Sequence, residues 1–469
     1  MVNIKKLFES LLKCIDYLVA IASVILCLTV FLLAIPWTLK KRKHWIQSAR
    51  GNNKLLIIQG FSAKELKTRG FEFLLPFRNP VMNWVGFFDP ANSMNEDIRV
   101  RDDLFVIARR LPQTIKLIKA IGLEATSIII RECYVVYKIV RFCVNEKVGI
   151  LRAYKHEYPA LRAFLVSCLI KIPFIVDITG NYELIYRLNG KLYYFRDLGR
   201  MPILRIFAPP LANWLLGLPL KRAAFVLGRN KNNYEHGFAI GAPVERLSLL
   251  RISNFSSAFN NCDLDHLPPP PLPYPYLLFV GRLVLIKFPF DVIEAFELAA
   301  AALPDYRLVM IGDGALRDDI VARIQSSAFK DRIVFTGPCS SDTVFTWTAH
   351  AKMAICPFSG YTLAEAMLCG IPVVAYDIEN HSEVVIDNYS GFLVPFRNVK
   401  ELAQTIVSVA GDYENARLMG LRGRELARIV YNKNRITEKE SMVYSQALHS
   451  GCPDDSSDRE DKLAQLVGR

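Results

Sequence analysis

Short apolar runs alternate with longer amphipathic stretches along the second half of the chain. The runs contain five or six residues rich in Leu, Ile, Val and Phe, as buried strands do. Those expected to form strands are Tyr276–Val280, Arg307–Ile311, Arg332–Thr336, Lys352–Cys356 and Ile371–Tyr376. The stretches between them have the 3.6-residue period of helices, as in Pro289–Ala302 and Leu316–Ser326. This alternation predicts a doubly wound parallel sheet that is covered by helices on both faces and binds ligands at the carboxyl ends of its strands.

A less regular α/β pattern occupies residues 50–266. The strands expected there are Leu55–Gln59, Ser127–Ile130, Pro173–Ile178 and Ala223–Leu227, with helices at Pro112–Ile121 and Ala160–Ile170 among them. Leu267–Pro275 (LPPPPLPYP) separates the two patterns, and its prolines favour an extended spacer. The sequence therefore predicts two α/β domains, at 50–266 and 276–430, joined by a proline-rich linker at 267–275.

The first 45 residues have a different pattern. Tyr17–Trp37 is 21 residues long without a charge, enough for a helix to cross a hydrocarbon core of about 30 Å. A cleaved signal peptide is the alternative, but its apolar region would be shorter, and here the basic cluster Lys40–Lys43 follows at once. Because more basic residues follow the span than precede it, the positive-inside rule places the rest of the chain in the cytoplasm. We therefore expect residues 1–45 to form a single-pass anchor and a basic juxtamembrane segment, with a bacterial inner membrane as the location.

Composition and charge narrow the partners of a chain whose 469 residues are too many for one hydrophobic core. The net charge is +13, with 19 more basic than acidic residues in 1–250 and 6 more acidic than basic residues in 251–469. Since the basic half also carries the apolar span, an anionic membrane surface fits it better than nucleic acid. The ten cysteines include no Cys-x-x-Cys pair, which favours reduced thiols over disulfides or a zinc site. The polar, acidic tail at 450–469 is expected to be disordered.

The stretch Ser359–Tyr376 carries the most informative chemistry. Its sequence predicts a glycine turn, the start of a helix, a glycine that ends the helix, and then a buried strand. A glycine turn that leads into a helix leaves backbone N–H groups without partners at the positive end of the helix dipole, which is a site for an anion. Glu365 lies one turn into the same helix and can accept hydrogen bonds from sugar hydroxyls. Together these features predict a nucleotide-sugar pocket.

Turns that follow earlier strands are expected to meet this stretch at one edge of the sheet. Gly281–Lys287 (GRLVLIK) supplies Arg282 and Lys287, which can converge on a diphosphate. Ile311–Gly314 (IGDG) and Phe335–Gly337 (FTG) allow the backbone to approach a ligand closely. Taken alone, each turn is more typical of an ordinary loop, and their common edge is what favours a ligand site.

Two acidic features have alternative interpretations. Glu383 follows the last predicted strand and could either bind a ligand hydroxyl or cap the next short helix. Asp263–Asp265 (DLD) matches an Asp-x-Asp metal motif. It lies in a polar stretch before the proline-rich segment rather than at a strand end, so we expect no metal site there.

These motifs together resemble glycosyltransferase family 4, retaining enzymes with two facing Rossmann-like domains, the GT-B fold. The similarity covers about residues 225–445 well and the first domain loosely. It implies that the carboxyl-terminal domain holds the nucleotide sugar, with Arg282 and Lys287 on the donor diphosphate and Glu365 on the ribose. It also implies a last helix, within 431–449, that crosses back to the first domain.

The motifs and the resemblance together give the expected site residues. Those expected to act in catalysis are Arg282, Lys287 and Glu365. Those expected to bind the donor are Gly281, Gly312, Gly314, Thr336, Gly337, Ser359, Gly360, Tyr361, Thr362, Leu363, Glu365 and Glu383. Those expected on the acceptor side are Asp177, Thr179, Asn181 and Tyr182.

The sequence departs from the family pattern at three positions. Pro357 stands where the first Glu of the family's Glu-x7-Glu motif would lie, so the carboxylate usual near the donor sugar is missing. Phe288 stands where a glycine often follows the lysine, and Thr179 stands where an acceptor-side histidine is expected.

The sequence thus predicts a membrane-anchored, retaining glycosyltransferase of cell-surface polysaccharide biosynthesis. Its expected donor is a nucleotide-diphosphate sugar, a UDP-sugar being the commonest choice in the family, and its expected acceptor is a lipid-linked saccharide. No metal or other cofactor is required, because Arg282, Lys287 and the helix start at Tyr361–Leu363 can neutralise charge on the leaving diphosphate. The alternative, motivated by Pro357 and Thr179, is a degenerate GT-B protein that acts as a membrane-bound nucleotide-sugar sensor or assembly partner. The sequence does not predict the oligomeric state.

Overall fold

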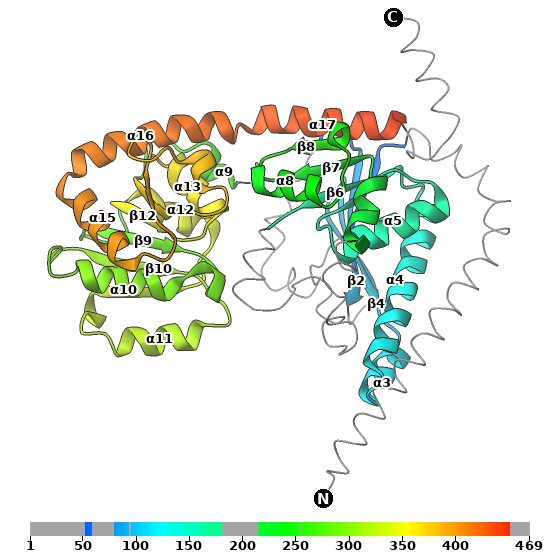
Figure 1. The fold of residues 1–469 in the computed structure, drawn as a ribbon, viewed down its shortest axis with the longest axis horizontal. Helices are drawn as coiled ribbons and strands as arrows, with labels where there is room; N and C mark the ends of the chain where they lie inside the picture. The colour runs from blue at the N-terminus through cyan, green and yellow to red at the C-terminus, as the bar shows by residue number, and fades with distance from the viewer. Residues whose placement is uncertain (1–51, 59–78, 93–94, 181–213, 254, 451–469) are drawn as a thin grey trace, which may run out of the picture. The chain divides into compact units, whose positions relative to one another are not determined.

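The computed structural model describes residues 52–58, 79–92, 95–180, 214–253 and 255–450 (Figure 1). The chain divides into two compact units. The first contains the residues up to 229, residues 233–250 and those from 438 onward, and the second contains 230–232 and 251–437. The apolar segment Tyr17–Trp37 and the tail after Ser450 lie outside the described residues. Within the ranges that are described, the helices are all too short or too polar to cross a membrane.

The first unit is built on an eight-stranded sheet in the order β3-β4-β2-β1-β5-β6-β7-β8. Neighbouring strands are parallel, except that the edge strand β3 is antiparallel to β4. The strands are β1 (Lys54–Ile58), β2 (Trp84–Asn92), β3 (Glu96–Arg101), β4 (Leu104–Arg110), β5 (Ile150–Ala153), β6 (Phe174–Ile178), β7 (Phe225–Gly228) and β8 (Leu247–Leu249). Every residue of β5 and β6 is buried, as expected for strands covered on both faces.

Helices cover this sheet. They include α3 (Gln113–Ala120), α4 (Glu124–Glu146), α5 (Tyr158–Ile170) and α8 (Lys231–Ala239). α4 packs on α5, and α5 packs on β1, β5 and β6. The core between them contains Ile139 and Cys143 of α4, Ala163 and Val166 of α5, and Val176 of β6.

The strand predicted at Ser127–Ile130 is wrong, because these residues lie in α4. The run of three isoleucines at 128–130 has high strand propensity. The 23-residue helix nevertheless buries Val135, Ile139 and Cys143 at the four-residue spacing of one helical face. Packing against the sheet therefore overrides the local preference.

The second unit has a six-stranded, fully parallel sheet in the order β11-β10-β9-β12-β13-β14. The strands are β9 (Tyr276–Val280), β10 (Arg307–Ile311), β11 (Ile333–Gly337), β12 (Met353–Cys356), β13 (Val373–Tyr376) and β14 (Phe392–Val394). The first five are the strands predicted from the sequence, and their bounds differ by at most two residues. The predicted parallel α/β sheet is confirmed.

Helices lie on both faces of this second sheet (Figure 1). They are α9 (Ser257–Asn260), α10 (Pro289–Ala299), α11 (Arg317–Gln325), α12 (Ser341–Ala349), α13 (Tyr361–Leu368), α14 (His381–Val384), α15 (Val399–Gly411) and α16 (Tyr413–Val430). α10 packs on α11 and α15, whereas α13 packs on α9, α12 and α16. The core beneath α13 includes Leu363 and Met367 from the helix and Ala354 and Val373 from the sheet.

The proline-rich segment Leu267–Pro275 does not link the two units as predicted. It lies inside the second unit, which begins at Arg251. Leu267 and Leu272 pack against the core of that unit, and the ring Nε2 of His350 contacts the carbonyl oxygen of Pro268. An extended proline segment can pack along a domain surface as well as bridge two domains, and its composition alone does not distinguish the two cases.

The last helix, α17 (Lys433–Ser450), crosses the division between the units at residue 437. Residues from Glu438 onward belong to the first unit. There, the carboxylate of Glu440 accepts a hydrogen bond from Arg152 of β5 at 2.6 Å. The carboxyl-terminal part of α17 is therefore bonded to the first sheet.

Candidate active site

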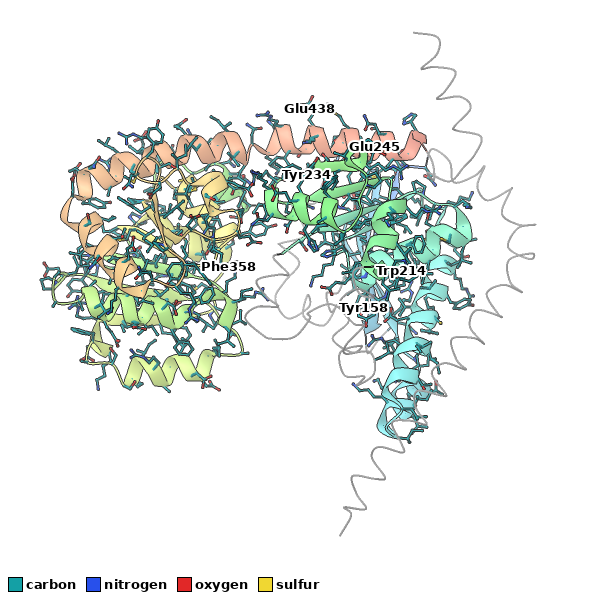
Figure 2. The ribbon with its side chains drawn as sticks, in the orientation of Figure 1. Tyr158, Trp214, Tyr234, Glu245, Phe358 and Glu438 are labelled. Carbon is teal, nitrogen blue, oxygen red and sulfur yellow. The ribbon has the colours of Figure 1, made fainter. Side chains whose placement is uncertain are left out.

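The turns that follow the parallel strands of the second unit lie at one edge of its sheet. β9 is followed by Gly281, β10 by Gly312, and β12 by the loop that contains Phe358, marked in Figure 2. Carboxyl ends of parallel strands share an edge, and this edge is where ligands of doubly wound sheets bind. The predicted donor-binding residues of 281–365 are thereby brought to the same edge.

The glycines of the first two turns allow backbone to approach backbone. Gly312 has φ +150°, and a Cβ atom built on it would lie 1.9 Å from the carbonyl oxygen of Gly281. A Cβ atom on Gly314 would lie 2.4 Å from the carbonyl oxygen of Leu283. The backbone N–H of Leu283 in turn donates to the carbonyl of Asp313 at 2.9 Å. Glycine at 312 and 314 is thus required by contacts within the protein, whatever their role toward a ligand.

The third turn is also held by internal bonds. The Thr336 hydroxyl donates to the carbonyl oxygen of Gly337 at 3.0 Å, and Gly337 has φ +74°. The turn therefore has a local structural role, and Thr336 has a bonding partner without a ligand.

The start of α13 differs from these turns because it is open. A Cβ atom on Gly360, the residue before the helix, would have no other atom within 4 Å, and no side chain caps the helix there. Tyr361 is exposed and Thr362 is partly exposed, whereas Leu363 is buried. The first turn of a helix has no intrahelical acceptors for its N–H groups. The N–H groups at the start of α13 are therefore accessible, and their binding of an anion stays a prediction.

Lys287 approaches this helix start from the loop after β9. Its ammonium donates to the carbonyl oxygen of Phe358 at 2.9 Å and lies 4.8 Å from the centre of the Phe358 ring. Burial, helped by the positive charge of Arg282, lowers the pKa of Lys287 to about 8. The Arg282 side chain is exposed and makes no salt bridge with any residue that the structure describes. Lys287 thus reaches the loop before α13, and Arg282 lies near enough to influence it; their contact with a diphosphate stays a prediction.

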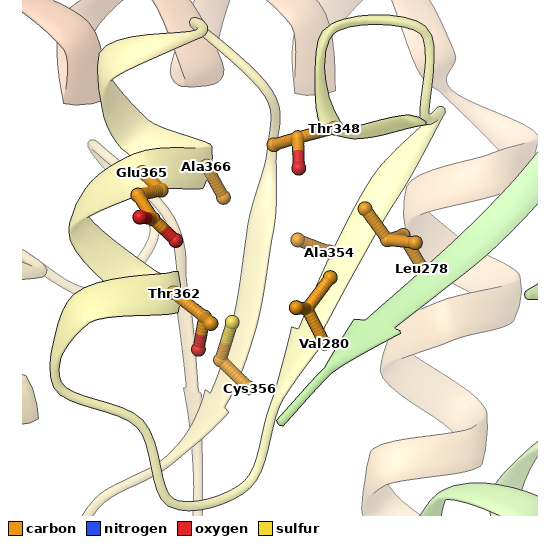
Figure 3. Close-up of a pocket in the computed structure, with 8 residues that line it drawn as sticks. All are labelled: Leu278, Val280, Thr348, Ala354, Cys356, Thr362, Glu365 and Ala366. Carbon is orange, nitrogen blue, oxygen red and sulfur yellow. The ribbon is translucent and has the colours of Figure 1, made fainter. Parts of the chain in front are cut away.

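Glu365 faces a small cavity beneath α13 (Figure 3). The volume open to the centre of a water molecule is about 10 Å³, which is room for about one water. The residues that line the cavity are Leu278, Val280, Thr348, Ala354, Cys356, Thr362, Glu365 and Ala366. Burial raises the pKa of Glu365 to about 7. No hydrogen bond to this carboxylate is formed by the residues that the structure describes, and the cavity has room for a water to bind it.

Two residues of the loop after β13 belong to the site although the sequence motifs did not single them out. His381 is fully buried, and its ring Nδ1 lies 2.7 Å from the carbonyl oxygen of Tyr376. Its Nε2 lies 3.1 Å from the backbone nitrogen of Ser359 and 2.8 Å from the carbonyl oxygen of the same residue. Burial lowers the pKa of His381, and the contacts with the backbone of Tyr376 and Ser359 oppose that shift. The histidine thereby ties the loop after β13 to the residue that precedes Gly360.

The other residue is Glu379, which has a left-handed backbone with φ +54°. Burial raises the pKa of Glu379 to about 7, and the positive charge of Lys287 opposes that rise. Its position in the run Asp377–Ser382, directly after a predicted strand, was the available sequence signal.

Glu383 is held by protein groups. One carboxylate oxygen accepts a hydrogen bond from the backbone N–H of Lys231 at 2.8 Å. The other lies 2.6 Å from the guanidinium of Arg251. The sequence left two roles open for Glu383, a ligand contact or a helix cap. In the structure both carboxylate oxygens instead contact protein groups, those of Lys231 and Arg251.

Phe288 occupies a backbone conformation that favours glycine. Its φ is +50°, between the short 3-10 turn Leu285–Lys287 and α10. The side chain is buried and contacts the rings of Tyr376 and Phe396 edge to face. Packing of this aromatic cluster compensates for the strained backbone, so the phenylalanine at the usual glycine position preserves the local turn.

The predicted acceptor-side residues lie in the first unit, where Asp177 is fully buried in a charge cluster. It accepts hydrogen bonds from Arg152 and from Arg229, each at 2.6 Å. Although burial raises the pKa of Asp177, the two guanidinium groups outweigh it and lower the pKa below its usual value. Arg152 also contacts the hydroxyl of Tyr444 of α17. Asp177 therefore connects the centre of the sheet and α17, and it is not exposed to an acceptor.

Thr179, which follows β6, is partly exposed, and its hydroxyl lies 3.5 Å from the carbonyl oxygen of Tyr154. Asn181 and Tyr182 lie outside the described residues. Among the residues that are described, no cluster of three His, Cys, Asp or Glu side chains could hold a metal ion.

Comparison with known proteins identifies a family that part of the chain matches. Residues 268–426 match the family described as Glycosyl transferases group 1. An alpha-D-kanosaminyltransferase from Streptomyces kanamyceticus is 23% identical over 310 residues, which are 61% of this chain and 74% of that protein. A D-inositol 3-phosphate glycosyltransferase from Mycobacterium sp. (strain KMS) is 33% identical over 140 residues, 28% of this chain and 31% of the relative. An N-acetyl-alpha-D-glucosaminyl L-malate synthase from Bacillus anthracis is 24% identical over 176 residues, 37% of this chain and 45% of the relative.

Solved structures share the whole architecture at low sequence identity. The crystal structure of Anabaena HepE in complex with UDP-glucose has a TM-score of 0.58 at 16% identity, covering 84% of this chain and 99% of that one. Sucrose-phosphate synthase from Thermosynechococcus elongatus has a TM-score of 0.60 at 16% identity, covering 84% and 98%. These similarities establish the fold as two α/β domains of the GT-B type.

Proposed function

We propose that this chain, whose residues 268–426 match the family described as Glycosyl transferases group 1, transfers a sugar from a UDP-sugar with retention of configuration. The observation that carries the donor proposal is the approach of Lys287 to the loop that precedes the open helix start at Gly360, with Arg282 near enough to Lys287 to lower its pKa. A diphosphate is the anion that would use two cations and a row of backbone N–H groups together. The UDP-glucose bound in the Anabaena structure supports a UDP-sugar as the first donor to test.

In the proposed reaction, the bond between the sugar and the diphosphate breaks and negative charge develops on the leaving diphosphate. Arg282, Lys287 and the N–H groups at the start of α13 stabilise that charge, and such preorganised groups are commonly a large term in catalysis. The acceptor hydroxyl attacks from the face that the diphosphate leaves, and its proton passes to a phosphate oxygen of the donor. No nucleophile of the enzyme is then needed, and Glu365 orients the ribose.

The donor proposal is tested by isothermal titration of the full chain with UDP and UDP-glucose, using two variants. Arg282→Ala removes an exposed cation that has no salt bridge among the described residues, so the fold should persist. Gly360→Ala adds a methyl group that meets no other protein atom within 4 Å. We expect each variant to raise the Kd by about tenfold, or about 1.4 kcal/mol, because a charge-assisted contact is lost or the approach of the diphosphate is hindered.

A matched control is Gly411→Ala, since Gly411 also has no atom within 4 Å of a built Cβ and lies at the end of α15. It should leave the Kd unchanged. Equal affinity in the wild type, Arg282→Ala and Gly360→Ala would refute the assigned donor site.

We further propose that the acceptor is a lipid-linked saccharide at a membrane, within cell-surface polysaccharide synthesis. The support is the uncharged segment Tyr17–Trp37, the basic cluster that follows it and the excess of 19 positive charges in residues 1–250. On this proposal the chain is a single-pass membrane protein with both units on the cytoplasmic side.

Pro357 favours one alternative, a donor-binding protein without transfer activity. The discriminating assay incubates the full chain with radiolabelled UDP-sugars and lipid extracts. Transfer of label to lipid, or release of free sugar, supports the enzyme. Donor binding without either product supports the sensor.

A further inference from the structure

Glu379 is a mostly buried carboxylate at the candidate active site that the proposed reaction leaves without a role. It follows β13, and its backbone adopts φ +54°, which side chains other than glycine rarely adopt. Strained backbone of this kind persists only where surrounding contacts hold it, and it gathers at functional sites. Asn230 hydrogen-bonds to the carboxylate, and Lys287 lies near enough to lower its pKa.

Pairing of strands places the Glu379 loop beside the loop that contains Pro357. β12 and β13 are parallel neighbours with Cys356 opposite Ala375, so the loops that follow them adjoin. His381 ties the same two loops through its bond to Ser359. The carboxylate of Glu379 is therefore presented at the edge where Pro357 provides no carboxylate.

The two carboxylates of the site occupy separate places. Glu365 lies on α13 and lines the cavity beneath that helix, whereas Glu379 lies in the loop after β13, close to Lys287 and Asn230. A nucleotide sugar carries two hydroxyl-bearing rings, one on each side of its diphosphate. If Lys287 binds the diphosphate and Glu365 the ribose, the remaining ring is the one still without a carboxylate partner.

We propose that Glu379 binds the transferred sugar by accepting hydrogen bonds from its hydroxyls, in place of the carboxylate that Pro357 lacks. This inference rests on the proposed function, since it presupposes that Lys287 binds the donor diphosphate. A negative charge close to Lys287 also repels a diphosphate. Glu379 therefore favours the intact donor over the free nucleotide that remains after transfer.

The test compares the Kd for UDP with the Kd for a UDP-sugar in the full chain. The probe is whichever of UDP-glucose, UDP-galactose and UDP-N-acetylglucosamine binds the wild type most tightly. Glu379→Gln keeps the shape and the strained backbone but removes the charge. Glu379→Gly removes the side chain and relieves the strain. Asp377→Asn is the matched control, because it neutralises an exposed carboxylate two residues away in the same loop.

Both Glu379 variants should raise the Kd for the UDP-sugar by about tenfold, while the Kd for UDP stays the same or falls because a repulsive charge is gone. Asp377→Asn should change neither value. An unchanged ratio of the two dissociation constants in both Glu379 variants would overturn the proposal. If the wild type binds neither UDP nor any of the three UDP-sugars, the proposed donor site itself fails, which is a different result from an unchanged ratio.

Discussion

At the scale of single residues, the site depends on groups whose ionisation is set by burial. Lys287, Glu365 and Glu379 have pKa values of about 8, 7 and 7, each moved toward neutrality chiefly by loss of water. Groups that titrate near neutral pH in a cleft are typical of functional sites. Their protonation should therefore control donor binding within the physiological range.

The pH dependence of donor affinity should report Lys287. Because Lys287 binds an anion only when protonated, and its pKa is about 8, the affinity for UDP should fall as pH rises from 7.5 to 9.5. Lys287→Arg keeps its charge over this range, so its affinity should be nearly constant. Titration calorimetry at half-unit pH steps measures both. If the affinity of Lys287→Arg for UDP fell in the same way, a group other than Lys287 would be responsible for the pH dependence.

At the scale of elements, the two sheets are organised by different contacts. In the second unit, glycines let the turns after β9 and β10 bond directly to each other. In the first unit, a buried cluster of Arg152, Asp177 and Arg229 joins β5, β6 and the segment after β7. Arg152 extends that cluster to Glu440 and Tyr444 of α17.

Loss of Asp177 should destabilise the first unit strongly. Asp177→Ala leaves two buried guanidinium groups without their shared partner, and breaking such a buried pair costs about 3–5 kcal/mol. The midpoint of thermal unfolding should therefore fall by about 10 °C, measured by calorimetry. Asp102→Ala is the control, since Asp102 is 93% exposed and pairs only with the exposed Arg99. Equal midpoints for the two variants would show that the cluster contributes little.

At the scale of the whole molecule, the protein combines a GT-B body with an apolar amino-terminal segment. The net positive charge lies in the half that carries this segment, which favours an anionic lipid surface. Attachment to a membrane would confine the transferase near a lipid-linked acceptor.

Deletion of residues 1–45 tests that attachment. We expect the full chain to stay in the membrane pellet after extraction with alkaline carbonate, because Tyr17–Trp37 would be inserted in the bilayer. The shortened chain should move to the supernatant while its affinity for UDP is retained. Release of the full chain by carbonate would contradict an inserted anchor.

The sequence determined the second sheet almost completely. Its strands are short, apolar and separated by helical periods, so local pattern and buried position agree. The sequence also indicated Arg282, Lys287 and Glu365 as candidate site residues, because charged residues that follow a predicted strand can be recognised from the sequence alone. The isoleucines at 128–130 led to a wrong strand prediction, and the prolines at 267–275 led to a wrong linker prediction. Both patterns occur in more than one environment, and packing selects among them.

Only the tertiary structure decided which glycines pack against other backbone segments and which face open space, because that depends on atoms far along the chain. Gly312 and Gly314 fit against other backbone segments, whereas Gly360 does not. The environment of Glu379 was likewise decided by the tertiary structure, because its carboxylate lies near Lys287, 92 positions earlier in the sequence. Burial, charge and strain at this site arise when distant segments meet, and local pattern cannot report them.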